Sequence, residues 1–216
     1  HAVTNMPGKI LFFHFLSVFT SSPEVMAHLI ILLSNLGAVL AYFVAKKLFK
    51  NQLAAFYVMI LYFFVPPKIY FFPLLNAITP VVALGTFYVF LRCLDTIPAR
   101  QSLWNRVRWS AAFGSLIYWN VFFDPISLAL GVLFLAFFLR ALFRKQLSLK
   151  QVGWNALGFV GALGVTHLFM IGAFGFDQVK SFQRAIELNA AYYAAPQYNP
   201  AWLYENYRVF FFNSGV

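Results

Sequence analysis

The stretch that decides the fold is residues 108–140, which run RWSAAFGSLIYWNVFFDPISLALGVLFLAFFLR. Arg108, Asp124 and Arg140 divide it into two uncharged runs of 15 residues each. Both outer flanks are basic, and basic flanks of apolar segments stay on the cytoplasmic side of a membrane. A single crossing helix cannot begin and end on one side. The stretch therefore predicts a helical hairpin that turns at Asp124–Pro125, because proline favours an extended residue before it and can open the next helix.

The composition of the whole chain points the same way. Of its 216 residues, 62% are hydrophobic and 10% are charged, against roughly 25% charged in an ordinary soluble domain. These figures exclude a disordered chain, a coiled coil and a soluble enzyme, and they predict an all-α, multi-spanning membrane protein. The single cysteine, Cys93, excludes a disulfide framework and cysteine-based metal motifs.

Three basic clusters set the predicted topology. Residues 46–50, 92–108 and 140–150 hold 11 of the 16 Lys and Arg residues, so the positive-inside rule places them in the cytoplasm. The net charge of +10 therefore reflects membrane topology, and nucleic acid is not an expected partner. A crossing helix needs about 20 residues, with roughly 17–25 tolerated. The prediction has six spans, at about 25–45, 52–66, 76–93, 109–123, 125–143 and 152–173.

The spans divide the chain into three regions. Residues 25–173 form the transmembrane domain, residues 1–24 an outer-face loop with an interfacial helix, and residues 174–216 an outer-face juxtamembrane segment. The apolar run within 10–22 is too short to cross, so it predicts either a helix parallel to the membrane plane or a membrane-hugging linker. The chain opens at His1 and closes in an apolar run, and we therefore expect both ends to be truncated.

Several polar and small residues have a structural and a functional interpretation. The last span carries Gly153, Gly158, Gly161, Gly164, Gly172 and Gly175, and the segment Gly161–Gly164 with its neighbours predicts close helix contact. His167, in the same span, fits a hydrogen-bonded packing residue better than a ligand. Asn76 is either the cap of the next helix or a polar contact at the membrane surface.

The outer segment carries a second pair of alternatives. Lys180 and Arg184 are four residues apart, so they share a helix face and could bind a phosphate. The other interpretation is a solvated face above a belt of tyrosine and tryptophan residues. A Gly-rich phosphate loop, a metal-spaced His/Cys pair and a nucleophile elbow are all absent from the sequence.

Three short segments resemble a known family. His1–Lys9 has the pattern His-x-x-x-Asn-x-Pro-Gly-Lys, residues 73–80 read PLLNAITP, and residues 198–206 read YNPAWLYEN. These segments are similar to recurrent outer-face segments of the GT-C superfamily of polytopic glycosyltransferases, in particular those similar to dolichyl-phosphate-mannose mannosyltransferases.

The resemblance implies transfer of a sugar from a polyprenyl-phosphate-linked donor at the outer membrane surface, with inversion at the sugar carbon. The family's catalytic carboxylate would precede His1, so the catalytic residues stay unknown; a divalent metal could bind in that same upstream loop, and no metal ligand is assigned here. The expected partners are membrane lipid and the lipid-linked donor. The expected location is the plasma membrane of a bacterium or archaeon, or the endoplasmic reticulum membrane of a eukaryote. The candidate substrate-binding residues are His1, Asn5, Lys9, Lys68, Asn76, Asp124, Lys180, Arg184, Tyr198, Trp202 and Arg208.

Two other classes remain open from the sequence. A transporter would have polar residues near the bilayer centre and internal repeats. The predicted spans have few such polar residues, and the sequence shows no convincing repeat. A non-catalytic membrane subunit would have neither a large outer segment nor clustered outer cations, whereas this sequence predicts both.

Overall fold

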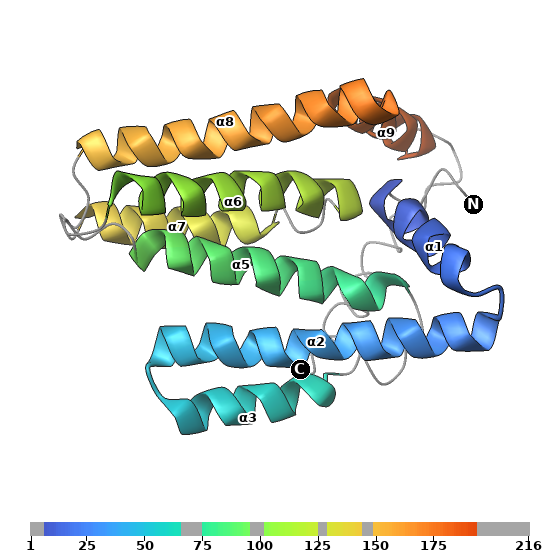
Figure 1. Ribbon diagram of the computed structural model, residues 1–216, viewed down its shortest axis with the longest axis horizontal. Coiled ribbons are helices and arrows are strands. Elements are labelled where there is room, and N and C mark those ends of the chain that lie inside the picture. The colour runs from blue at the N-terminus through green and yellow to red at the C-terminus, as the bar shows by residue number, and fades with distance from the viewer. Residues whose placement is uncertain (1–6, 66–74, 96–101, 125–128, 144–148, 194–216) are drawn as a thin grey trace.

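The computed structural model describes residues 7–65, 75–95, 102–124, 129–143 and 149–193, and these residues are all-α (Figure 1). They form eight α-helices and one 3₁₀ turn. In chain order these are α1 (Pro7–Phe19), α2 (Pro23–Phe49), α3 (Gln52–Phe63), η2 (Leu75–Ile78), α5 (Thr79–Asp95), α6 (Leu103–Phe123), α7 (Leu130–Phe143), α8 (Leu149–Phe174) and α9 (Gln178–Tyr193). The predicted all-α class is confirmed, and helix covers most of each of the six predicted spans.

Three segments are long and apolar enough to cross a membrane, namely Pro23–Phe49, Leu75–Asp95 and Lys150–Phe174. They indicate an integral membrane protein. Helices α3 and α7 are apolar but have 12 and 14 residues, which corresponds to about 18 and 21 Å at 1.5 Å per residue. Helix α6 has 21 residues but is less apolar, because its first turns carry Arg106 and Arg108.

Local sequence explains where several helices begin and end. Ser22, Asn51 and Ser102 each accept a backbone N–H bond at the start of α2, α3 and α6, which satisfies amides that have no partner within the helix. Lys50 closes α2 in the left-handed conformation, with φ 52° and its N–H bonded to the carbonyl of Lys46. The predicted capping role of Asn76 is wrong, because this exposed residue lies inside η2 rather than before α5.

The long helices lie side by side, and successive ones run in opposite directions (Figure 1). Helix α2 packs against α3 and α5, α5 packs against α6, and α6 packs along α8, while α7 lies against α5. Helix α1 differs in direction, because it runs obliquely across one end of the bundle and contacts the last turns of α6 (Figure 1). Helix α9 lies at this same end, beside the end of α8 (Figure 1).

This arrangement separates the charges of the described residues to the two ends of the bundle. At the end formed by the α2–α3 turn lie eight basic residues and one acid: Lys46, Lys47, Lys50, Arg92, Arg106, Arg108, Arg140, Lys150 and Asp95. We call this the basic end. The opposite end, crossed by α1, has three basic residues and four acids: Lys9, Lys180, Arg184, Glu24, Asp124, Asp177 and Glu187. We call this the α1 end.

Helices α6 and α8 approach closely through two glycines. A Cβ atom on Gly114 would lie 2.2 Å from the carbonyl oxygen of Phe159, and one on Gly158 would lie 3.1 Å from the carbonyl oxygen of Val107. The close approach predicted for the glycines of the last span is confirmed at Gly158, whereas nothing lies within 4 Å of a Cβ built at Gly161 or Gly164.

The separation of charge predicts which end faces the cytoplasm. Glu24 and Lys50 are exposed at opposite ends of α2, and the sole cysteine of the chain, Cys93, is buried. A membrane-impermeant maleimide should label Lys50→Cys only after the cytoplasmic side is opened, and Glu24→Cys from outside, because basic ends are retained inside. Unsubstituted protein serves as the control for Cys93. Labelling in the reverse sense would invert the topology.

Candidate functional site

The α1 end is built on a close backbone contact between α1 and α6. A Cβ atom on Gly8 would lie 2.7 Å from the carbonyl oxygen of Phe122 and 2.7 Å from the Cα of Phe123. Only glycine fits such an approach without displacing the backbone of α6. The next residue of α1, Lys9, is thereby brought to the C-terminal end of α6.

A partly buried ion pair forms at this contact. Lys9 Nζ lies 2.5 Å from Asp124 Oδ2, and the two side chains are 9% and 16% exposed. The hydroxyl of Thr79, the first residue of α5, donates to the same oxygen at 3.1 Å. The Asp124 backbone N–H bonds to the carbonyl of Asn120 at 2.7 Å and ends α6. Residues from α1, α5 and α6 therefore meet at one carboxylate.

An open apolar groove of about 590 Å³ runs beside this ion pair. Its walls come from one face of α1 and from the adjoining ends of α5, α6 and α8. The lining is apolar or aromatic except for His14 and the indole N–H of Trp119. Gly8 and Phe123 line it next to Lys9 and Asp124, so one end of the groove lies beside this partly buried ion pair.

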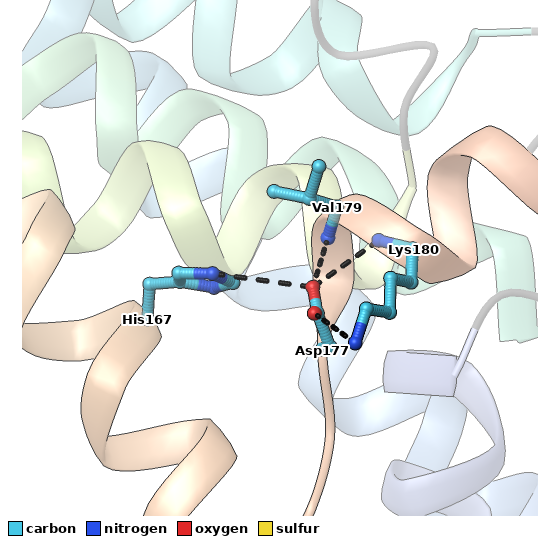
Figure 2. A network of polar contacts seen from close by, with 4 residues as sticks. All are labelled: His167, Asp177, Val179 and Lys180. Carbon is cyan, nitrogen blue, oxygen red and sulfur yellow. Dashed lines mark hydrogen bonds and ion pairs between the residues drawn. The ribbon is translucent and has the colours of Figure 1, made fainter.

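A second polar cluster lies where α8 passes into α9 (Figure 2). The Asp177 carboxylate accepts the backbone N–H groups of Val179 and Lys180 at 3.0 and 3.1 Å. Both of these N–H groups bond to Oδ1, and His167 Nε2 lies 4.0 Å from the same oxygen. The other oxygen, Oδ2, lies 3.6 Å from Lys180 Nζ. The hydrogen bond from the Lys180 backbone N–H is the main cause that holds the pKa of Asp177 below its ordinary value of 3.8. The charge of Lys180, the hydrogen bond from the Val179 N–H and His167 lower this pKa further.

Tyr118 lies beneath this cluster. Its ring is 5.9 Å from the ring of His167, and its hydroxyl oxygen is buried with no hydrogen-bond partner in the described part of the chain. The packing role predicted for His167 holds in part, since it contacts Tyr118 on one side, but it also faces the carboxylate of Asp177. Tyr118 was not predicted, because an aromatic residue within an apolar helix gives no separate signal.

The structure brings together two of the eleven predicted substrate-binding residues, Lys9 and Asp124. Lys180 and Arg184 lie on α9, where both are exposed and each pairs with an acid three residues away; Arg184 is 3.0 Å from Glu187. Asn76 is exposed in η2. The remaining candidates, His1, Asn5, Lys68, Tyr198, Trp202 and Arg208, lie outside the described residues. No cluster of three or more His, Cys, Asp or Glu residues that could hold a metal ion occurs within the described ranges.

Comparison with known proteins finds no match: no protein-family model, no curated protein and no solved structure is significantly similar to this chain.

The Lys9–Asp124 pair predicts a specific pattern of stabilities. Lys9→Met or Asp124→Leu alone should lower the free energy of unfolding by about 3–5 kcal/mol, because each leaves one charge buried without its partner. The double variant should lose much less, since both charges are then gone. Denaturant unfolding of the protein in detergent measures all four corners of this cycle. Additive losses in the double variant would mean that the pair is not coupled.

Proposed function

We propose that this chain belongs to an integral membrane glycosyltransferase that moves a sugar from a polyprenyl-phosphate-linked donor to an acceptor at the α1 end. The observation that carries the proposal is the apolar groove under α1, which is open, lies at one end of a membrane bundle and has charged residues at its edge. In this proposal the basic end faces the cytoplasm, the six helical segments cross the membrane, and α1 lies in the outer interface.

The groove fits the chain of such a donor. Its lining of Phe, Leu, Ile, Val and Trp side chains offers no hydrogen bonds beyond those of His14 and Trp119. An isoprenoid chain is a branched hydrocarbon, so its burial there is favoured by about 25 cal/mol per Å² of apolar surface. Leu11 and Phe15 remain 46% and 56% exposed on the α1 wall, and a bound chain would cover them.

The cations at the α1 end suit the phosphate of the donor. Lys180 and Arg184 are 83% and 69% exposed, and their present partners are acids three residues away along the chain, Asp177 just before α9 and Glu187 on it. Exposed pairs of this kind are worth roughly 0.2–1 kcal/mol, whereas a charge-assisted hydrogen bond to phosphate is worth roughly 1.5–3 kcal/mol. A phosphate can therefore displace Glu187 from Arg184 at little cost. Lys9 is already neutralised by Asp124 and is better suited to holding α1 in place.

The chemistry of the proposed transfer follows from the donor. An acceptor hydroxyl oxygen attacks the anomeric carbon, the bond from that carbon to the phosphate oxygen breaks, and the polyprenyl phosphate leaves with inversion at carbon. Cations near the phosphate stabilise the charge that develops on the leaving group. The base that takes the hydroxyl proton is not assigned among the described residues.

The polar groups inside the bundle favour an enzyme over a transporter. Asn120 donates to Thr86 and to the carbonyl of Leu116, and Ser115 pairs with Thr166 at 3.1 Å. These neutral groups satisfy one another between α5, α6 and α8. The charged residues of the described part lie at the two ends, which is not the arrangement expected of an ion pathway through the bilayer.

A matched pair of substitutions on α1 tests the groove. Leu11 lines it and Ile10 does not, although the two are adjacent and 46% and 47% exposed. In the full-length protein, Leu11→Gln should lower turnover of a polyprenyl-phosphate sugar by about ten-fold, because a polar amide replaces apolar contact. Ile10→Gln should leave turnover near that of the unsubstituted protein. Equal effects in both variants would remove the groove from donor binding.

A second pair tests the phosphate role of Arg184. Arg184→Ala should lower donor turnover by about ten-fold or more, because it removes a bidentate cation. Glu187→Gln should preserve turnover or raise it, since it removes the competing acid. If the ion pair is only structural, both variants should behave alike. Expression level and thermal unfolding in detergent provide the control for folding.

A further inference from the structure

A second cavity lies toward the basic end, away from the groove under α1. It has a volume of about 340 Å³ and is bounded by α5, α6, α7 and α8. Helix α7 packs on α5 while α8 packs on α6, and the cavity lies where these two pairs of helices diverge. Phe134 and Leu135 line it from α7, and Ala156 and Phe159 from α8.

The cavity opens on a face of the bundle that is apolar. Leu135 is 56% exposed at the cavity, and its neighbour Val132 is 73% exposed. On α8, Leu157 and Val160 are both 63% exposed. In an integral membrane protein such a face meets lipid tails, so hydrocarbon chains are the molecules with access to this opening. A volume of this size is at the small end of the range for ligand sites, roughly 300–1,000 Å³, and suits one chain rather than a whole lipid.

One wall of the cavity is polar. Cys93 Sγ lies 3.2 Å from Ser110 Oγ, and Ser110 Oγ lies 3.1 Å from Asn155 Oδ1. The three residues come from α5, α6 and α8. The Nδ2 group of Asn155 donates to no other residue in the described ranges, and it therefore offers two N–H groups to a carbonyl or ester oxygen of a bound lipid.

Positive charge lies directly beyond the cavity. On α6, Arg106 precedes the lining residues Ser110 and Phe113 by four and seven residues, so the three share one helix face. The guanidinium groups of Arg92 and Arg108 both lie over the ring of Trp109, 5.1 and 5.6 Å from its centroid. A lipid whose chain enters the cavity from the α7–α8 side would have its head group beside these guanidinium groups.

We propose that this cavity is a binding site for an anionic phospholipid of the leaflet at the basic end. One acyl chain occupies the space between α7 and α8, the ester region faces the Asn155 amide, and the phosphate head group lies against Arg106 and its basic neighbours. Basic pockets between membrane helices on the cytoplasmic side are sites of this kind. The proposal is independent of the function proposed for the α1 end, because the two sites share no residue.

Binding of phosphatidylglycerol and phosphatidylcholine to the full chain in detergent, followed by native mass spectrometry, tests the proposal. The unsubstituted protein should retain phosphatidylglycerol about ten-fold more tightly than phosphatidylcholine, because only the former carries net negative charge. Ala156→Trp should abolish this retention by filling the cavity. Leu157→Trp, at the adjacent residue that does not line it, is the matched control and should retain the lipid.

Arg106→Gln separates the head-group contact from the chain contact. It should reduce the retention of phosphatidylglycerol to about that of phosphatidylcholine. Because Arg106 is buried, thermal unfolding of each variant checks that it is folded. Equal retention of the two lipids by the unsubstituted protein, or unchanged retention in Ala156→Trp, would overturn the proposal.

Discussion

The exclusion of charge and of unpaired backbone groups from hydrocarbon is the constraint on which this structure depends. Inside a bilayer each backbone N–H and C=O must find a partner within the protein, and the α-helix provides this within one segment. The described residues are accordingly helical except for short connections. The same constraint moves Lys, Arg, Asp and Glu to the helix ends, and it leaves only neutral groups such as Asn120, Thr86 and Ser115 between the helices. The two-ended distribution of charge follows directly.

Within that framework, α6 organises the bundle. It packs against α5 and α8 along its length and receives α1 at its C-terminal end. Gly114 lets α8 approach in the middle, while Gly8 of α1 lets a second helix approach at the end. Close approach in both places depends on the absence of a Cβ atom, because lipid tails give apolar side chains no hydrophobic reason to associate and contact must come from packing. The groove under α1 exists because α1 crosses the bundle end rather than continuing its direction.

The two ends of the molecule differ in the chemistry they offer. The α1 end combines an apolar groove, a partly buried Lys9–Asp124 pair and exposed cations on α9. In the described part of the chain, the basic end combines an apolar cavity with an excess of guanidinium and ammonium groups and one acid, Asp95, which pairs with Lys47. Both therefore join a space for hydrocarbon to positive charge, which is the pairing that a lipid phosphate requires. Among the described residues, acids balance the cations at the α1 end, whereas cations outnumber acids at the basic end.

The sequence by itself determined the helical class, the approximate helix positions and the sorting of charge to two ends. These depend only on the length of uncharged runs and on the order of basic clusters, which are properties read along one dimension. The tertiary structure decided which residues meet. Lys9 and Asp124 are 115 residues apart, and the sequence named both without pairing them. It named six glycines of the last span without showing that Gly158 is the one that meets α6, and it did not name Gly114. A helix that is apolar on all sides carries no mark of which face turns inward, so its rotation, and with it every contact in the site, is fixed only by packing against its neighbours.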